Sequence, residues 1–335
     1  MENNVKYTFK DFASDQEVRW CPGCDDYVVL RAMQKALPDM GLKKEEVVFI
    51  SGIGCSSRFP YYMDSYGFHS IHGRAPGIAT GVKLANPNLS VWVMTGDGDA
   101  TAIGGNHFIH LLRRNLDINV VLFNNEIYGL TKGQFSPTSL VGQKTKSSPY
   151  GNTQSPFIIG ELALGAKARF FARIPGNEPK TLTDAFIQAE SFKGTSLVEV
   201  LQNCVIFNDG CFTKYTDKDL RDDAQLVVEH GKPMIFGKNK DKGIVLNGLK
   251  LEVVTIGEEG ITESSILVHN AEEQDPTLHQ MLIRLEYPLV TGVIRKVSEE
   301  TFEDREQQLT NKIKSASKVT SVDDLFFAGE TYDVK

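Results

Sequence analysis

The sequence contains no long hydrophobic run and no excess of positive charge, and both absences narrow what the chain can do. No apolar run approaches the roughly 20 residues that a membrane helix needs. Lysine and arginine number 36 against 43 aspartates and glutamates, a formal net charge of -7. We therefore expect neither nucleic acid nor a membrane as a partner, because no global basic surface exists to neutralise phosphates or anionic lipids. The first ten residues lack the charged and apolar blocks of a signal peptide, which predicts a cytoplasmic protein.

Cysteine is also scarce, and its scarcity excludes a disulfide framework. The chain has five cysteines in 335 residues, and the cytoplasm keeps thiols reduced. Metal or cluster ligation, or inert burial, remains for them. With 41% apolar and 24% charged residues, the chain can bury a large core and exceeds the usual size of one domain. We expect one large domain with an appendage.

Between residues 27 and 202, short apolar runs alternate with helical stretches. This alternation predicts an α/β fold with a doubly wound, mainly parallel sheet. Ligands in such sheets bind beyond the carboxyl ends of the strands, so the loops that follow strands are the places to look for chemistry. Strands are expected at residues 47–51, 91–95, 119–123, 168–174 and 197–201, with helices from about Tyr27, Ala75, Ile103, Pro156 and Thr181.

After Asn208 the alternation weakens. A polar stretch at residues 209–243 leads into a mixed region, and residues 299–315 are charged and predicted to form a solvated helix. We therefore divide the chain into a site-bearing domain at residues 1–208 and a C-terminal extension at residues 209–335. The extension is expected to wrap the core or a partner.

Polar side chains follow two consecutive predicted strands. Asp97 lies in a GDGD turn after one of them, and Asn125 is the second residue of an asparagine pair after the next. About one helix and one strand separate the two, so both residues would end adjacent parallel strands and converge on one point. Oxygen ligands gathered at one point suit Mg²⁺, which readily shares phosphate oxygens.

Glycines in the same turn suit a diphosphate. Gly96 and Gly98 allow close approach of the backbone, and a helix that opens near Ala102 would offer free N–H groups to an anion. Alone, the GDGD turn is also compatible with a hairpin or the start of a calcium loop. The EF-hand spacing fails, because no glutamate stands twelfth from Asp97. Together with the distant asparagines, the turn predicts a magnesium–diphosphate site.

The cysteines lie in three separate loops. Cys21 and Cys24 form a CPGC turn, while Cys55 and Cys204 each follow a predicted strand. Four thiolates gathered from three loops can hold a 4Fe-4S cluster. Structural zinc usually takes two close pairs, and a thioredoxin-like role lacks the expected strand–helix context. Cys211, seven residues beyond Cys204, is left over and is an alternative fourth ligand.

The motifs CPGC, GIGCSSRFPYY, FHSIHGRAPGIATG, GDGDATAIGGNH, NNEIYGLTKGQFSPT and NCVIF occur in this order. Over about residues 19–208 the chain thereby resembles beta subunits of 2-oxoacid:ferredoxin oxidoreductases, whose fold is the thiamine-diphosphate-binding pyrophosphate domain. The resemblance implies Mg²⁺ ligands at Asp97, Asn125 and Ile127, and 4Fe-4S ligands at Cys21, Cys24, Cys55 and Cys204. We expect the residues around thiamine diphosphate to be Gly54, Cys55, Ser56, His72, Gly73, Arg74, Gly96, Asp97, Gly98, Asp99, Asn125, Ile127, Tyr128, Gly129, Leu130 and Thr131.

The resemblance also implies an activity and partners. It implies oxidative decarboxylation of a 2-oxoacid with coenzyme A, with electrons passing singly through the cluster to ferredoxin. An alpha subunit, possibly fused to a gamma domain, would supply the glutamate that activates the aminopyrimidine, because no domain recognisable here does so. We expect an α2β2 heterotetramer. Asp25 stands where the family usually has glycine. Its carboxylate would either lower the potential of a nearby cluster or cap the following helix, and we expect the cap.

Two cations in strand-end loops bear on the substrate. Arg58 and Lys132 can pair with the distal carboxylate of a dicarboxylic substrate, and GLTKGQ resembles the 2-oxoglutarate subgroup. We expect 2-oxoglutarate, converted to succinyl-CoA and CO2, with pyruvate as the alternative. In another interpretation, Lys132 binds only phosphate or a surface carboxylate.

Two further residues, in the IHGRAPG motif, have two interpretations each. His72 is a candidate acid–base group or a structural histidine. Arg74 is a diphosphate or interface contact, or forms a salt bridge at a helix start. Two other functions compete with the oxidoreductase: a non-redox thiamine enzyme, and a non-catalytic binding module with a structural metal.

Overall fold

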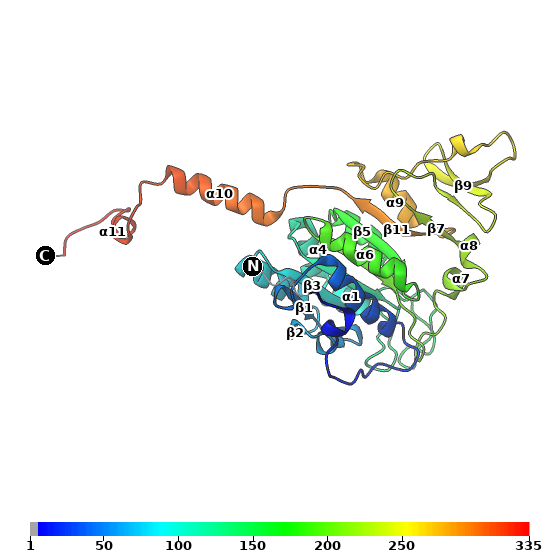
Figure 1. Ribbon diagram of the computed structural model, residues 1–335, viewed down its shortest axis with the longest axis horizontal. Coiled ribbons are helices and arrows are strands. Elements are labelled where there is room, and N and C mark those ends of the chain that lie inside the picture. Colours follow the sequence, from blue (N-terminus) through cyan, green and yellow to red (C-terminus); the bar gives the residue numbers. More distant parts are fainter. Residues whose placement is uncertain (1–5, 335) are drawn as a thin grey trace.

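The computed structural model describes residues 6–334 and centres on an eight-stranded sheet (Figure 1). The strand order is β2-β1-β3-β4-β6-β5-β11-β7, and every neighbouring pair is parallel except β5 and β11. The predicted α/β fold with a mainly parallel sheet is confirmed. The strands are β1 Val47–Ser51, β2 Tyr66–His69, β3 Ser90–Gly96, β4 Asn119–Asn124, β5 Phe170–Pro175, β6 Ser196–Leu201, β7 Gln225–Val228 and β11 Leu289–Lys296.

The sheet is buried on both faces, which explains why its central strands are almost wholly apolar. In β4, Val120 and Leu122 face one core while Val121 and Phe123 face the other. The five predicted strands all form for this reason. β2 was not predicted; it is short, and its four residues are all exposed.

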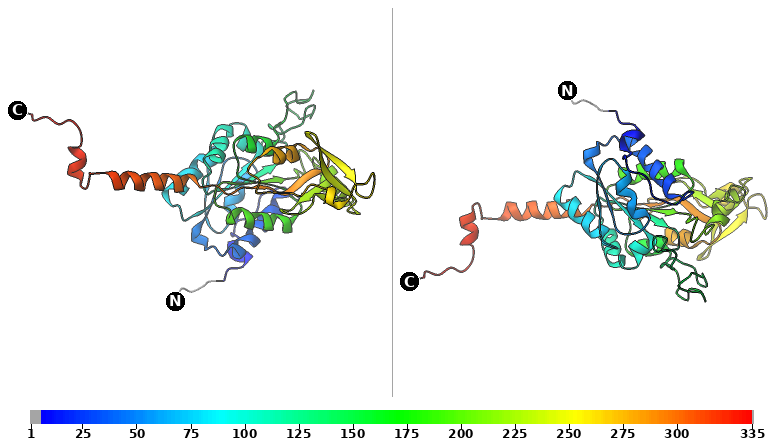
Figure 2. Two further views of the ribbon diagram at one scale, coloured as in Figure 1. Left: turned by 90° about the horizontal axis from the view of Figure 1, so that it is seen from above. Right: turned by 90° about the horizontal axis from the view of Figure 1, so that it is seen from below.

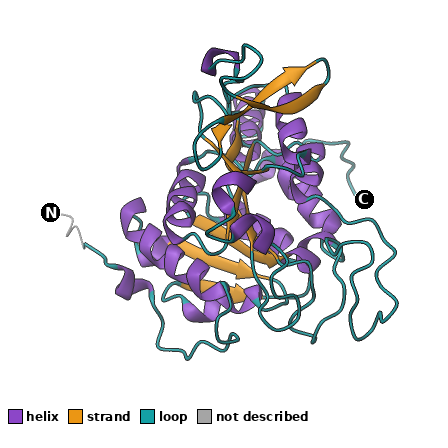
Figure 3. Cartoon of the chain, turned by 90° about the vertical axis from the view of Figure 1, so that its right-hand side faces the viewer, coloured by secondary structure: helices purple, strands orange, loops and turns teal. Residues whose placement is uncertain are grey.

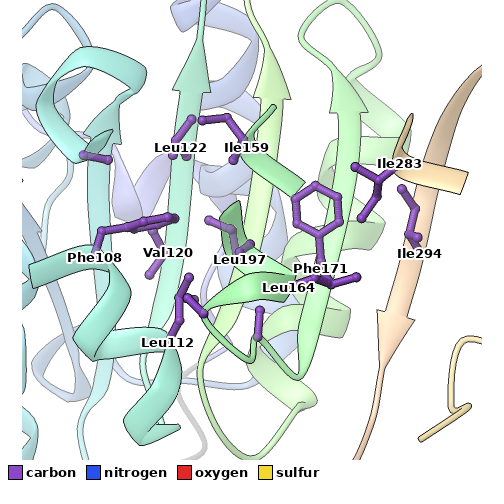
Figure 4. Close-up of a cluster of buried hydrophobic side chains, with 14 of the residues drawn as sticks. Phe108, Leu112, Val120, Leu122, Ile159, Leu164, Phe171, Leu197, Ile283 and Ile294 are labelled. Atoms are coloured by element: carbon purple, nitrogen blue, oxygen red, sulfur yellow. The ribbon is translucent and has the colours of Figure 1, made fainter. Parts of the chain in front are cut away.

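Helices cover both faces of the sheet (Figure 3). α1 Asp26–Met40 and α6 Pro179–Ser191 contribute to one core. The other core receives residues from α2 Ala75–Ala85, α4 Gly105–Arg114, α5 Ile159–Gly165 and α9 Thr277–Arg284. Figure 4 shows part of this second core, with Phe108 and Leu112 of α4 beside β4.

The chain after β3 departs from its prediction. The short helix α3 Asp97–Thr101 begins at the first aspartate of the turn, and α4 starts only at Gly105. Ala102 has φ -87° and ψ -104° and separates the two helices. The helix expected to open near Ala102 is α4, which starts three residues later, and the short α3 before it was not predicted. The short elements elsewhere are η1 Phe9–Phe12, η2 Lys44–Glu46, η3 Ser56–Tyr62, η4 Glu263–Ser265, α7 Thr213–Thr216 and α8 Arg221–Ala224.

The chain beyond Asn208 forms two strands of the main sheet, a separate small sheet and two projecting helices. β7 and β11 complete the main sheet, and β8 Ile235–Phe236, β9 Lys242–Asn247 and β10 Lys250–Thr255 form a separate antiparallel sheet. The helices α10 Phe302–Ala316 and α11 Val322–Phe326 then project from the body (Figure 2). The helix expected at residues 299–315 is thus present and solvated, whereas a domain boundary at Asn208 stays a prediction. Within residues 6–334, every helix is too short or too polar to span a bilayer.

Candidate functional site

Two cavities of about 210 Å³ each lie at the carboxyl ends of the central strands. We call them the glycine-loop cavity, around the GDGD turn, and the cysteine cavity, around Cys21 and Cys24. A wider groove of about 900 Å³, between α6 and the small sheet, contains none of the predicted site residues. The two smaller cavities have a common wall, formed by Asp26, Cys55, Asn125, Gly129 and Leu130.

The glycine-loop cavity collects residues from four strand-end loops. Every expected thiamine-diphosphate contact lines it except Gly73 and Arg74, and Asp26, Ile53 and Phe123 line it in addition. Arg74 is exposed and hydrogen-bonds His107 of α4 instead. Gly73 is buried behind the cavity, where its N–H donates to Asp99.

Asp97 lies in this cavity with only 3% of its surface exposed. Two hydroxyls of the long loop after β4 hold one of its oxygens: Ser136 and Thr138 donate to Oδ2 at 2.5 and 2.6 Å. Burial raises the pKa of Asp97 to about 6, and these hydroxyl bonds oppose that rise. The site therefore holds a costly buried carboxylate that a cation would stabilise.

Asn125 and Ile127 face the same cavity from the end of β4. The Asn125 side chain donates to Gln202 Oε1 at 2.7 Å, and its Oδ1 accepts from the Ile127 N–H at 3.2 Å. Carboxylate, amide and peptide oxygens are hard ligands of the kind that Mg²⁺ prefers. The donor set of this cavity thus fits Mg²⁺ with a diphosphate.

Gly98 has a reason to be glycine that the sequence did not reveal. A Cβ at this position would lie 2.2 Å from the ring of Tyr128, whose hydroxyl donates to Gly98 O at 3.1 Å. The absent side chain makes room for the tyrosine that forms part of the cavity wall.

We expect Gly98→Ala to lower stability by about 1–3 kcal/mol, as overpacking does, and to weaken thiamine diphosphate binding by displacing Tyr128. Thermal melting and calorimetric titration measure the two effects. Gly81→Ala is the matched control, because Gly81 also lies in a helix but has open space around it. Equal stability and equal coenzyme affinity in the Gly98 and Gly81 variants would contradict this packing argument.

Asp99 holds the loops together rather than only facing the cavity. Its Oδ1 accepts from the N–H groups of Ile53 and Gly73 at 3.0 and 2.7 Å, and its Oδ2 accepts from the Thr95 hydroxyl at 2.7 Å. Oδ1 also lies 2.6 Å from His72 Nδ1. Since an ionised carboxylate can only accept, this contact assigns the proton to Nδ1 and leaves Nε2 of His72 as the free ring nitrogen.

The cysteine cavity is lined by Cys21, Cys24, Cys55 and Cys204. The Sγ atoms of Cys204 and Cys55 would lie 3.4 and 3.7 Å from a Cβ built on Gly129, so they flank this glycine. Within residues 6–334, no group of three or more histidine, cysteine or acidic side chains is arranged for a single metal ion. The four thiols thus surround a space instead of meeting at a point.

Cys211 does not line the cysteine cavity. Its Sγ is 4.0 Å from both Asn125 O and Gln202 O. Burial raises the pKa of Cys211 and Cys24 well above the usual range, and that of Cys55 to about 12. Without a bound cation these thiols stay protonated at neutral pH, and metal binding has to displace the protons.

At the start of α1, the sequence-based interpretation of Asp25 was wrong and the position of Asp26 in the site was missed. Asp25 makes no side-chain cap; its Oδ2 accepts from the N–H of Asn203 at 2.9 Å. The cap prediction was therefore wrong, because the carboxylate anchors the loop that carries Cys204. Asp26 is 2% exposed and lines both cavities. Burial, followed by the charge of Asp25, raises the pKa of Asp26 to about 7, while a hydrogen bond with Cys24 lowers it.

Arg58 and Lys132 line the cysteine cavity, not the glycine-loop cavity. Both therefore lie on the cysteine side of the common wall, of which Leu130 is part. Trp20, which the sequence did not single out, also lines the cysteine cavity and donates its indole N–H to Cys55 O at 2.7 Å. No local sequence signal connects Trp20 with Cys55, since 35 residues separate them.

Comparison with known proteins gives consistent matches. Residues 52–200 match the family model described as thiamine pyrophosphate enzyme, C-terminal TPP binding domain. The chain is 49% identical to the 2-oxoglutarate oxidoreductase subunit KorB of Mycobacterium tuberculosis over 331 residues, which cover 97% of this chain and 88% of that protein. It is 48% identical to the 2-oxoglutarate synthase subunit KorB of Archaeoglobus fulgidus over 185 residues, 55% of this chain and 69% of that one.

A solved structure is also similar. It is the 2-oxoglutarate:ferredoxin oxidoreductase from Magnetococcus marinus with 2-oxoglutarate, coenzyme A and succinyl-CoA bound. The match has a TM-score of 0.77 and 29% identity, and covers 98% of this chain and 97% of that chain. The family model begins directly after β1 and spans β3 and β4, the strands directly followed by Asp97 and Asn125.

Proposed function

Since the chain belongs to the family of 2-oxoacid:ferredoxin oxidoreductase beta subunits, we propose that it oxidatively decarboxylates 2-oxoglutarate with coenzyme A to succinyl-CoA and CO2. The names of its relatives and the molecules bound in the Magnetococcus marinus enzyme support this substrate. The observation that carries the proposal is the common wall between an oxygen-lined cavity and a cysteine-lined cavity. Side by side, they suit a reaction that forms a reductant at one site and takes its electrons at the other.

Thiamine diphosphate, when bound, supplies the carbon nucleophile of the decarboxylation, and a 4Fe-4S cluster supplies a one-electron acceptor. In our proposal Asp97, Asn125 and Ile127 hold Mg²⁺ against the diphosphate. Ser136 and Thr138 keep Asp97 oriented from behind. Tyr128 closes the cavity beside Gly98 and helps to exclude water.

The cluster ligands proposed are Cys21, Cys24, Cys55 and Cys204. Their arrangement around a cavity of about 210 Å³ favours a polynuclear cluster over one zinc ion, which needs ligands within about 2.3 Å of a single point. The position of Cys211 outside that cavity favours Cys204 as the fourth ligand.

His72 is proposed to hold or move a proton at Nε2. Its Nδ1 is paired with Asp99, so the ring has a fixed orientation at the edge of the glycine-loop cavity. This carboxylate–imidazole arrangement is typical of a general base whose second nitrogen faces the reacting group. Arg74, which hydrogen-bonds His107, has no part in the proposal.

Lys132 and Arg58 are proposed to attract the distal carboxylate of 2-oxoglutarate. Replacing Lys132 with alanine should lower kcat/KM for 2-oxoglutarate by about 10- to 100-fold, the loss expected for one charge-assisted hydrogen bond. The value for pyruvate should hardly change. The measurement is the ratio of the two kcat/KM values, with Lys144→Ala, an exposed lysine of the same long loop, as control. An unchanged ratio would show that Lys132 lines the cysteine cavity without binding the substrate carboxylate.

The proposed assembly is a cytoplasmic α2β2 heterotetramer. An alpha subunit, possibly with a fused gamma domain, would complete the coenzyme site, and ferredoxin would accept the electrons. Co-expression with the alpha subunit and an anaerobic assay test the function. We expect methyl viologen and ferredoxin to be reduced only when both 2-oxoglutarate and coenzyme A are present.

The same assay separates the alternatives. Reduction with pyruvate but not 2-oxoglutarate would favour the pyruvate enzyme. Release of CO2 without reduction of either acceptor would favour a non-redox thiamine enzyme, and neither reaction would favour a binding module.

A further inference from the structure

Gln202 is a buried polar residue with hydrogen bonds that reach both cavities. It follows the last residue of β6, lines the cysteine cavity and is 1% exposed. Its Oε1 accepts from Asn125 Nδ2 at 2.7 Å. Its Nε2 donates to Cys24 Sγ at 3.1 Å and to the backbone oxygen of Asn203 at 2.7 Å. One side chain thereby connects a residue of each site.

The orientation of this amide follows from its partners. The peptide oxygen of Asn203 can only accept a hydrogen bond, so the NH2 group of Gln202 has to face it. A cysteine sulfur that ligates iron is likewise an acceptor, and it lies on the same side. The Oε1 atom of Gln202 must then face Asn125.

This orientation determines which atom Asn125 presents to the glycine-loop cavity. Because Gln202 offers an acceptor, Asn125 turns its NH2 group towards Gln202 and its Oδ1 away from it. The rotated amide would direct a donor, which cannot bind a cation, at the proposed Mg²⁺. The backbone of Asn125 is held by the same loop, since Asn208 Nδ2 donates to Asn125 O at 2.9 Å.

The other end of Gln202 acts on the cluster. Hydrogen bonds to cysteine sulfurs withdraw negative charge from an iron–sulfur centre, and they are one of the factors that set its reduction potential. An N–H donor on Cys24 stabilises the reduced, more negative cluster. Loss of this donor should therefore lower the reduction potential.

We propose that Gln202 is a positioning residue that sets the metal-binding orientation of Asn125 and, through the same amide, raises the reduction potential of the cluster by donating to Cys24. The inference rests on the proposed function and assigns a role to a residue outside both ligand sets. Gln202 couples the coenzyme site to the electron acceptor across their common wall.

Two substitutions of Gln202 test its hydrogen bonds to Asn125 and to Cys24 separately. Gln202→Leu removes both hydrogen bonds, so it should weaken Mg²⁺-dependent thiamine diphosphate binding by about tenfold or more, as loss of an outer partner of a metal site does. It should also lower the cluster potential. Gln202→Glu keeps an oxygen that can accept from Asn125 but removes the N–H donor to Cys24. It should lower the potential and leave the Mg²⁺ affinity nearly unchanged.

The experiment uses the anaerobically purified complex with the alpha subunit. Calorimetry measures thiamine diphosphate affinity as a function of Mg²⁺, and a redox titration followed by electron paramagnetic resonance measures the cluster potential. Gln188→Leu is the matched control, because Gln188 is exposed on α6 and lines neither cavity. If Gln202→Leu does not fold, Gln202→Glu still tests the effect on the potential.

The outcomes are distinct. A lowered potential in both variants, with weakened Mg²⁺ affinity only in Gln202→Leu, supports the proposal. Unchanged potential and affinity in variants that retain iron and coenzyme would overturn it, even if their melting temperatures fall. A wild-type complex without iron would overturn the proposed function itself, and the role of Gln202 with it.

Discussion

Replacing Cys55 with serine should remove the proposed iron–sulfur cluster and, with it, the proposed reduction of ferredoxin. Cys55 belongs to the wall common to both cavities, and its Sγ flanks Gly129 together with that of Cys204. A serine hydroxyl is a poor replacement for a thiolate ligand of iron. We expect 2-oxoglutarate-dependent reduction to fall by more than about a hundredfold, the upper end of the cost of losing even an outer partner of a metal site.

Cys211→Ser is the decisive control for the cysteine assignment. Cys211 is buried to a similar degree as Cys55, but it lies outside the cysteine cavity. The control should retain iron, sulfide and the visible absorption of the cluster. If it loses iron while Cys55→Ser keeps it, the assignment of the ligands is wrong.

Replacing Asp97 with asparagine should abolish Mg²⁺-dependent binding of thiamine diphosphate without removing the cluster. The carboxylate is the only charged side chain among the proposed Mg²⁺ ligands, and its replacement leaves only neutral oxygens facing a diphosphate. We expect an affinity loss of at least about a hundredfold. Calorimetric titration measures it, with Asp39→Asn on the exposed face of α1 as control.

The Asp97→Asn substitution should weaken coenzyme binding, but it should not lower the stability of the metal-free protein. Burial raises the pKa of Asp97 from 3.8 to about 6, so folding favours its protonated form and the ionised carboxylate costs stability. This cost develops as pH rises from about 4 towards 6 and is fully present at neutral pH. Metal-free Asp97→Asn should therefore melt no lower than wild type at pH 7. A large fall in melting temperature would show that the charge is compensated within the chain.

The sequence predicted which residues come together wherever the strand-end rule applies. Asp97 and Asn125 line one cavity, as expected, because parallel neighbouring strands β3 and β4 end at the same edge of the sheet. The same geometry gathers Cys55, after β1, and Cys204, after β6, around the other cavity. Such positions follow from topology, which the apolar alternation reveals.

Contacts between distant segments were not predictable in this way. Gln202 is separated from Asn125 by 77 residues and from Cys24 by 178, so no local pattern indicates its role. The Asp25 carboxylate is able to cap a helix, but it accepts a hydrogen bond from the N–H of the distant Asn203 instead. The glycine at position 98 suggests a diphosphate contact from the sequence, whereas the ring of Tyr128 fills the space beside it.

The strands beyond Asn208 were missed as parts of the main sheet for a related reason. β11 pairs with β5 and β7, and its partners in β5 lie more than a hundred residues earlier in the chain. β7 has only four residues. β7 lies within the polar stretch after Asn208 and β11 lies beyond it. The place of both strands in the sheet therefore depends on tertiary pairing rather than on a pattern in their own sequence.

The central claim is that one chain binds thiamine diphosphate and an iron–sulfur cluster on opposite sides of a common wall. Anaerobic purification with the alpha subunit, followed by analysis of iron, acid-labile sulfide and thiamine diphosphate, tests it most directly. We predict a brown complex with about four irons, about four sulfides and about one thiamine diphosphate per beta subunit, all traceable to this chain by the Cys55 and Asp97 variants. A colourless complex that contains zinc, or one without thiamine diphosphate, would contradict the claim.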